Sequence, residues 1–169
     1  MIWFNQSTVG FKYLAPEHPC VLTVKVMTAD GALMLAFPSA KHLYEFSRWS
    51  RTGGNRKGVR RAWEEMCTMD CIDLPAWRQV HGARADWKIT RQAIMRRVLL
   101  AKYGQHWDLA TMLRNTGLEE LVYLDPNPYW GKSKAGRGQN LLGLLTADVR
   151  NALRLRLEAA EPEEVKASA

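Results

Sequence analysis

The stretch from Tyr129 to Asn140 is the part of the chain whose residue types best suit binding chemistry. Its sequence, YWGKSKAGRGQN, holds three glycines and three cations behind an aromatic pair, and the apolar run Leu141–Leu145 follows at once. Glycines let backbone N–H groups approach a ligand, and the amides that open a helix favour an anion. Asn140 lies where the N-cap of that helix is expected. The loop therefore predicts a phosphate-binding site, with Tyr129 and Trp130 able to stack on a base or a ribose.

A second group of residues suits contact with a polyanion. Six cations fall within fourteen residues, and two tryptophans flank them: Arg48, Arg51, Arg56, Lys57, Arg60 and Arg61, with Trp49 and Trp63. The whole chain has a formal net charge of +7, although its last twelve residues carry four glutamates against one lysine. This cluster predicts contact with nucleic-acid phosphates, or else a solvated helix surface.

The cysteines do not form a pattern typical of disulfides or metal sites. Cys20, Cys67 and Cys71 are an odd set without the paired spacing of secreted proteins, which predicts a reducing, cytoplasmic location. On a helix, Cys67 and Cys71 would share a face near His42 or His81, but this spacing lacks the turn geometry of most structural zinc sites. We therefore expect no metal and no cofactor. No apolar run reaches the ~18 residues that cross a membrane, so we expect no membrane partner.

The elements that must position these residues begin with a β-hairpin. Residues 21–27 alternate between apolar and polar types, Thr28–Gly31 suits a turn, and a second apolar run ends at Phe37–Pro38. Ser39 can then cap a helix that reaches about Trp49.

Helices account for most of the remaining chain. We expect them over 59–68, from Leu74-Pro75, over 86–103 with Gly104 as its end, over 106–116 and over 140–158, with a short strand over 119–124. Apolar residues recur at helical spacing in the two longest: Trp87, Ile94, Val98 and Ala101 in one, and Leu141, Leu145, Val149 and Leu153 in the other. The predicted fold is mainly α within the α+β class, a helical bundle with a small N-terminal hairpin over residues 1–157. Residues 158–169 are expected to be an acidic, disordered tail.

Several segments follow one another in an order typical of one known family. They are Met1–Phe4, Gly10–Pro16, Pro38–Tyr44, Trp87, Ile94–Lys102, Thr116-Gly117, Leu121-Val122, Tyr129–Gly131, Gly138–Gly143 and Arg150. On these segments, up to about residue 155, the chain resembles the NADAR superfamily. That superfamily includes riboflavin-pathway N-glycosidases and ADP-ribosyl-guanine hydrolases.

The resemblance implies cleavage of an N-glycosidic bond between a ribose C1 and a base or amine. Positive charge develops at C1 in such a reaction, so a carboxylate can stabilise it or activate water. The chain departs from the family pattern at three acidic positions. Lys41 stands where the family has Glu before His42, Asn127 replaces an Asp two residues before Tyr129, and Lys132 replaces an Asp after Gly131.

Three interpretations of these departures stay open. Hydrolysis could use relocated acids, Glu45 and Asp125; Lys41 or Lys132 could act as an amine on an opened sugar aldehyde; or the domain could bind its ligand without chemistry. The exchange of carboxylates for cations favours the third. The expected ligand is ADP-ribose or a related phosphorylated ribosyl nucleotide, free or carried on nucleic acid. The expected binding residues are Lys12, Trp87, Asn127, Tyr129, Trp130, Gly131, Lys132, Arg137 and Asn140.

Overall fold

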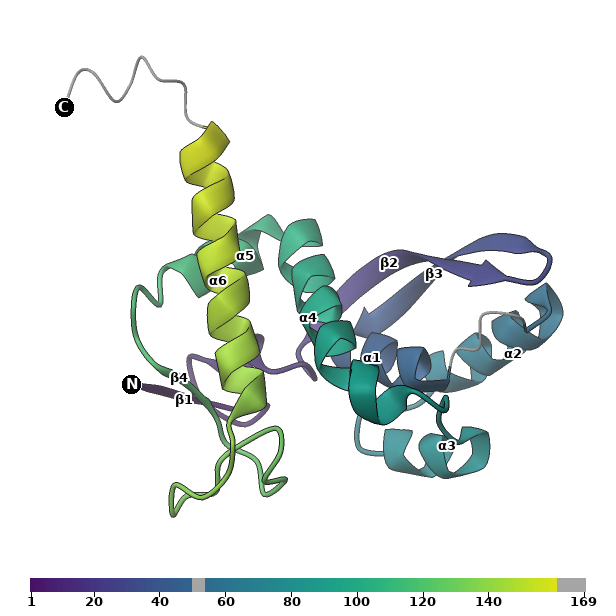
Figure 1. Ribbon diagram of the computed structural model, residues 1–169, viewed down its shortest axis with the longest axis horizontal. Helices are drawn as coiled ribbons and strands as arrows, with labels where there is room; N and C mark the ends of the chain where they lie inside the picture. Colours follow the sequence, from purple (N-terminus) through teal and green to yellow (C-terminus); the bar gives the residue numbers. More distant parts are fainter. Residues whose placement is uncertain (50–53, 161–169) are drawn as a thin grey trace. The chain divides into compact units, whose positions relative to one another are not determined.

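Two groups of elements, each packed around its own core, make up the computed structural model, which describes residues 1–49 and 54–160 and the side chains up to residue 156 (Figure 1). The hairpin unit comprises Ala15–Gln105. The loop unit comprises Met1–Leu14 and the chain from His106 onward. Helices dominate, with two small two-stranded sheets, so the predicted α+β class is confirmed.

The hairpin unit begins with the predicted antiparallel pair. Strand β2 (Pro19–Thr28) pairs with β3 (Gly31–Ser39), and Thr28 lies opposite Gly31 across a two-residue turn. Gly31 has a φ of 109°, a conformation that glycine adopts without strain. The Thr28 hydroxyl donates to the Gly31 carbonyl at 2.6 Å and closes the turn. The hairpin prediction is confirmed.

Two side-chain caps start the next helices. Helix α1 (Ala40–Trp49) begins after Ser39, whose hydroxyl accepts the His42 N–H at 3.4 Å, so the predicted cap is confirmed. Helix α2 (Arg56–Cys67) begins three residues earlier than predicted, because the Asn55 side chain accepts the Gly58 N–H at 2.7 Å. Helix α3 (Leu74–His81) has a proline in its first turn, as expected.

Helix α4 (Trp87–Gln105) is longer than predicted. Gly104 does not end it; the helix continues to Gln105, whose side-chain amide exchanges two hydrogen bonds of 2.9 Å with the backbone of Thr23 on β2. Of its predicted apolar face, Trp87 and Val98 are buried, whereas Ile94 and Ala101 are only half-buried. The buried residues are Trp87, Met95, Val98, Leu99, Lys102 and Tyr103.

The loop unit joins strands from both ends of the chain. Strand β1 (Ile2–Phe4) pairs in parallel with β4 (Leu121–Tyr123), and Trp3 lies opposite Val122. A 3₁₀ turn, η1 (Lys12–Leu14), and helix α5 (Trp107–Arg114) complete this part of the unit. The strand predicted over 119–124 is confirmed as β4. Its pairing with β1, more than a hundred residues away in the sequence, could not be predicted from local patterns.

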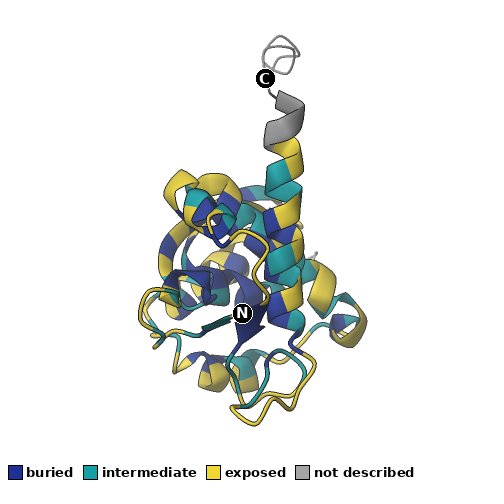
Figure 2. Ribbon diagram, turned by 90° about the vertical axis from the view of Figure 1, so that its left-hand side faces the viewer, coloured by how far each residue is buried: buried dark blue, intermediate teal, exposed yellow. Residues whose placement is uncertain are grey.

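Helix α6 (Leu141–Ala160) packs against β4 through a face that shares Val149 with the predicted one but is otherwise shifted. Figure 2 shows buried and exposed residues alternating along it. The buried positions include Leu142, Thr146, Val149 and Arg150, whereas Leu141 and Leu145 are half-buried. The reason is Gly143, where a Cβ would overlap the carbonyl oxygen of Leu121, so this glycine sets the line of closest approach.

Helix α6 runs to Ala160, which lies beyond residue 158, the expected start of the acidic tail. The remainder of the predicted tail, 161–169, lies outside the described residues. None of the helices in the described part of the chain has the length and apolar content that crossing a bilayer requires.

Candidate active site

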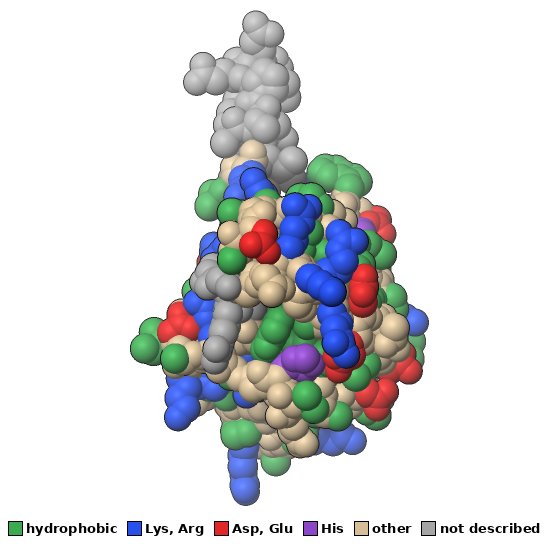
Figure 3. Space-filling view, turned by 90° about the vertical axis from the view of Figure 1, so that its right-hand side faces the viewer, with side chains coloured by type: hydrophobic (Ala, Val, Ile, Leu, Met, Phe, Trp, Pro, Cys, Tyr) green, Lys and Arg blue, Asp and Glu red, His purple; other side chains and the backbone are tan. Residues whose placement is uncertain are grey.

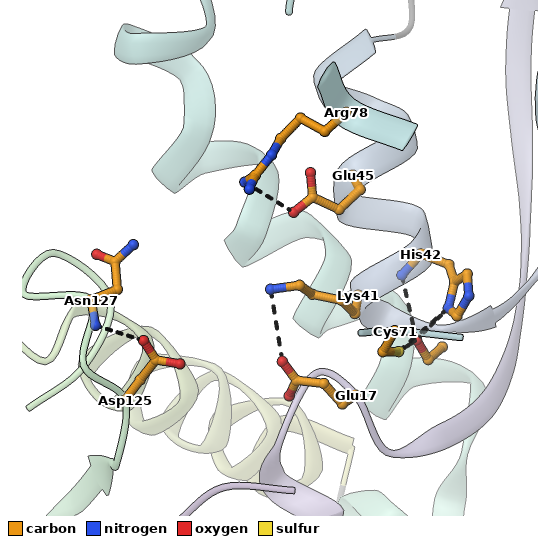
Figure 4. Close-up of polar contacts among 9 residues, drawn as sticks. Glu17, Lys41, His42, Glu45, Cys71, Arg78, Asp125 and Asn127 are labelled. Atoms are coloured by element: carbon orange, nitrogen blue, oxygen red, sulfur yellow. Dashed lines mark hydrogen bonds and ion pairs between the residues drawn. The ribbon is translucent and has the colours of Figure 1, made fainter. Parts of the chain in front are cut away.

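One polar face of α1 in the hairpin unit carries Lys41 and Glu45, one helical turn apart. The Nζ of Lys41 lies 3.7 Å from Oε1 of Glu17, a residue of the segment before β2 (Figure 4). This approach follows from the backbone, because the Lys41 N–H donates to the Pro16 carbonyl at 2.9 Å. Sequence reasoning missed Glu17, since its pairing with α1 depends on how the chain enters the hairpin.

Glu45 is a buried carboxylate with only 4% of its surface exposed. Its Oε1 lies 3.7 Å from a terminal nitrogen of Arg78 on α3, and its Oε2 has no hydrogen-bond partner among the described residues (Figure 4). A buried carboxylate oxygen without a partner costs free energy, which makes Oε2 a suitable acceptor for a ligand or water. The catalytic role predicted for Glu45 stays a prediction.

Arg48 and two aromatic rings surround the same part of α1. The Arg48 guanidinium lies 5.9 Å from the ring centroid of Trp87, which packs on Tyr44 at 5.0 Å. Burial lowers the pKa of Arg48, as does the nearby charge of Arg78, while Glu45 opposes this shift. Arg48 is thus half-buried against Trp87, unlike the exposed cations of α2.

His42 has a structural role on α1. Its Nδ1 lies 2.8 Å from the Ser39 hydroxyl, and its Nε2 donates to the Met69 carbonyl at 3.0 Å, so both ring nitrogens are engaged. The Cys71 sulfur lies 3.8 Å from Nδ1, and burial raises the pKa of the thiols of Cys71 and Cys67. No group of three His, Cys, Asp or Glu side chains in residues 1–49 and 54–156 could hold a metal ion.

The loop unit shapes its glycine-rich loop with two side-chain turns. Asp125 Oδ1 accepts the Asn127 N–H at 2.7 Å, and Asn127 Oδ1 accepts the N–H groups of Tyr129 and Trp130 at 3.0 and 3.4 Å (Figure 4). The two aromatic rings meet edge to face at 4.8 Å. Asp125 and Asn127 thus hold the aromatic pair in place.

Two glycines bring the loop strands together. A Cβ at Gly131 would lie 2.7 Å from the Tyr123 carbonyl oxygen, and one at Gly138 would overlap the carbonyl oxygen of Gly131. Gly138 also has a φ of 130°. Gly131 is buried against the end of β4, where a side chain would not fit. The packing of the loop on β4 therefore requires a glycine here, whether or not the loop binds a ligand.

The cations of the loop unit are only partly available. Lys132 Nζ lies 3.7 Å from Oε1 of Glu120, so a nearby acid balances its charge. Arg137 is exposed, and its backbone carbonyl accepts the Ser133 N–H at 2.8 Å to close the turn. Lys12 is exposed at the start of η1. Arg137 and Lys12 can therefore reach an anion in solution.

Asn140 precedes α6 as predicted, but its side chain does not cap the helix. Its Oδ1 accepts the Tyr123 N–H and its Nδ2 donates to the Leu121 carbonyl, both at 2.9 Å. The residue is 2% exposed and has a φ of 56°. The predicted N-cap role is wrong, because the end of β4 offers a donor and an acceptor that match the amide. Both atoms of the Asn140 amide thus bind the end of β4, and its ligand-binding role stays a prediction.

Four of the six clustered cations lie exposed on α2 at spacings of three and four: Arg56, Lys57, Arg60 and Arg61. Figure 3 shows Lys and Arg side chains prominent on the face it presents. Trp63 instead donates to the Ala36 carbonyl at 2.9 Å, and Trp49 packs on Trp77. Arg51 lies outside the described residues. Of the six residues predicted to contact nucleic acid, the four on α2 are therefore the ones whose side chains are exposed.

The comparisons with known proteins agree with this fold. N-glycosidase YbiA of Escherichia coli is 35% identical over 71 residues, which cover 41% of this chain and 44% of that protein. N-glycosidase Npun_R5314 of Nostoc punctiforme is 36% identical over 72 residues, 42% of this chain and 46% of the relative. Riboflavin biosynthesis protein VVA0006 of Vibrio vulnificus is 27% identical over 153 residues, 90% of this chain and 38% of the relative. The chain thus spans less than half the length of each of these curated relatives.

A solved structure shows the same fold. The NMR structure of the E. coli protein YbiA matches with a TM-score of 0.67 at 22% identity and covers 95% of this chain and 88% of that one. The model of the NADAR domain matches residues 3–154. Since that match includes nearly every element of both units, the chain belongs to the NADAR domain family.

Proposed function

We propose that this chain is an N-glycosidase that breaks the bond between a ribose C1 and a base or amine in a phosphorylated ribosyl nucleotide. The observation that carries the proposal is Glu45, a carboxylate buried on α1 with one oxygen free of hydrogen bonds among the described residues. At an effective dielectric constant of about 20, a carboxylate 4 Å from a unit positive charge stabilises it by about 4 kcal/mol. This corresponds to about a thousandfold in rate.

Arg78 supports this role of Glu45. A lone carboxylate on a buried helix face would lose its hydration without compensation, and the guanidinium 3.7 Å away offsets part of that cost. Its contact is with Oε1, which leaves Oε2 for the sugar or for an attacking water. We assign Glu45 as the catalytic carboxylate and Arg78 as its positioning residue.

The cations at positions 41 and 132 do not argue against hydrolysis. Lys41 lies beside Glu17, and Lys132 lies beside Glu120, so each of these two cations has a neighbouring carboxylate. Glu17 is a second candidate acid near the start of α1. The same pairing argues against Lys41 as an amine nucleophile, because attack on a sugar aldehyde needs a free amine.

Binding without catalysis is the second candidate function. It is favoured by the loop unit, where Asp125 uses one carboxylate oxygen to hold Asn127 while Tyr129, Trp130 and Arg137 offer rings and charge to a base and a phosphate. In this interpretation the chain binds ADP-ribose or a related nucleotide and releases no product.

Product release from two substrates separates the two functions. The full chain is incubated with a ribosylamino-pyrimidine phosphate and with ADP-ribosylated guanine in an oligonucleotide, and products are resolved by chromatography. We expect turnover of at least one substrate and a loss of about a hundredfold or more in Glu45→Gln. Glu17→Gln tests the second acid, and Glu64→Gln, an exposed glutamate on α2, is the matched control.

Calorimetry with ADP-ribose completes this test. Binding without product at stoichiometric enzyme would assign the chain to the binding function, and Lys132→Glu or Arg137→Glu should then weaken the affinity. Full activity in Glu45→Gln would refute the assignment of Glu45.

We further propose that a nucleic-acid strand carries the substrate to this domain, because the four cations on α2 are exposed along one helix. Binding of an unmodified single-stranded oligonucleotide should weaken steeply with salt. Arg60→Glu with Arg61→Glu should reduce the slope of log affinity against log salt by about two. A flat salt response of the unaltered chain would exclude this proposal.

A further inference from the structure

The hairpin unit has a cavity of about 390 Å³, open to solvent on one side, that the proposed function does not use. It lies between β2, α1 and α4, and its apolar lining includes Val24, Val26, Leu43, Phe46, Ile94 and Val98. Volumes of this size are typical of sites for small molecules.

The cavity explains why burial along β2 changes. Leu22 on the inner face of the strand is fully buried, whereas Val24 and Val26 on the same face are half-buried. On α4, Ile94, Val98 and Ala101 form one stripe at helical spacing, and two of them are half-buried as well. The apolar side chains at this place therefore surround a space that the chain itself does not fill.

This cavity is separate from the candidate active site. Its residues on α1 are Leu43, Phe46 and Ser47, whereas Lys41 and Glu45 lie on the opposite face of the same helix. A ligand in the cavity would therefore not touch the Glu45 carboxylate.

The charged residues that line the cavity are all basic. Lys25, Arg84 and Arg97 contribute to the lining, and none of the lining residues is acidic. Arg84 is paired with Asp86 through a hydrogen bond of 2.8 Å and a second, shorter one. Lys25 and Arg97 are exposed and form no ion pair with another described residue. An anionic group at the mouth would find two cations that have no acid beside them.

We propose that this cavity binds a small molecule with an apolar aromatic body and one anionic group. The apolar body would occupy the space between β2, α1 and α4, and the anion would contact Arg97 and Lys25. Apolar burial supplies affinity and the charge supplies orientation, which is the usual division in small-molecule sites.

The probe is 8-anilinonaphthalene-1-sulfonate, which joins an aromatic body to a sulfonate and fluoresces when it leaves water. Its uncharged counterpart is N-phenyl-1-naphthylamine. With the full chain we expect saturable binding of the anionic probe that is about tenfold tighter than binding of the neutral one. Ala101→Phe, which narrows the cavity from the α4 side, should weaken binding of both probes. Arg97→Glu should weaken only the anionic probe, and Lys88→Glu, an exposed change elsewhere on α4, should change neither.

Several results would overturn the proposal. Unchanged anionic-probe binding in folded Ala101→Phe would place the probe elsewhere, and unchanged binding in Arg97→Glu would remove the role of charge. Displacement of the probe by ADP-ribose would assign it to the nucleotide site instead. Arg97→Glu alters an exposed side chain, so it keeps the test decisive if the larger substitution prevents folding. The proposed N-glycosidase activity is not needed for any of these readouts.

Discussion

Lys102 is fully buried in the hairpin unit. We predict that it makes the free energy of unfolding rise as the pH increases above about 7. Its Nζ donates to the Ala15 carbonyl at 2.8 Å and lies 5.3 Å from the ring centroid of Tyr103. Burial lowers the pKa of Lys102 to about 8, against the opposing charges of Cys20 and Glu17.

The magnitude follows from the two pKa values. In the unfolded chain the lysine has a pKa of about 10.4. Between that value and the folded value of about 8, the unfolded state binds more protons, so the free energy of unfolding rises with pH. Below pH 8 the lysine is charged in both states, and the cost of burying the charge is fully present. From pH 7 to 9.5, Lys102 should therefore add about 2 kcal/mol to the free energy of unfolding.

Lys102→Met tests this prediction because methionine has a similar length and does not titrate. Urea unfolding of both proteins at pH 7 and at pH 9.5 gives the difference in stability at each pH. This subtraction also cancels Tyr13, Cys67 and Cys71, for which burial raises the pKa and which act in the opposite direction.

The Ala15 carbonyl loses its lysine partner in the variant at either pH but keeps the His18 N–H at 3.2 Å, so the loss adds a constant cost of about 1 kcal/mol. We expect the free energy of unfolding of the wild type, minus that of the variant, to increase by about 2 kcal/mol from pH 7 to pH 9.5. The exposed Lys88→Met should show no such change. A difference that stays constant between the two pH values would refute the reasoning from burial.

The remaining predictions concern the approach of α6 to β4, with a glycine of α4 as the comparison. Gly143→Ala should lower the free energy of unfolding by about 2 kcal/mol or more, because its Cβ would overlap the Leu121 carbonyl oxygen. Gly104→Ala, in an α4 position with open space, should instead stabilise the chain by about 0.5 to 1 kcal/mol; equal urea midpoints for the two variants would contradict this. Asn140→Ala should cost about 2 to 4 kcal/mol, since it removes the side-chain hydrogen bonds to the Tyr123 N–H and the Leu121 carbonyl. In this variant the Tyr123 amide hydrogen should exchange faster with solvent. Unchanged exchange would contradict the assigned role of the Asn140 side chain.

Local sequence patterns were sufficient to predict the elements that depend on neighbouring residues. The alternation over 21–27 with a turn at Thr28–Gly31 predicted the hairpin, and Ser39 predicted the start of α1. These features form through contacts within a few residues, so the local sequence carries the necessary information.

The same reasoning failed where a distant partner changed a local preference. Gly104 is a plausible helix end, but Gln105 binds the backbone of Thr23 and extends α4. Asn140 is a plausible N-cap, but the end of β4 takes both atoms of its amide. In both cases hydrogen bonds to a distant strand determine the conformation, in place of the helix-end or helix-cap preference of the local sequence.

The sequence by itself determined the family resemblance, the glycine-rich loop and the presence of Glu45 one turn after Lys41. Only the tertiary structure decided that Glu17 lies beside Lys41, that Arg78 holds Glu45, and that the space behind α1 stays unfilled. The physical reason is that charge pairing and cavity volume depend on which elements meet, and those contacts join residues far apart in the chain.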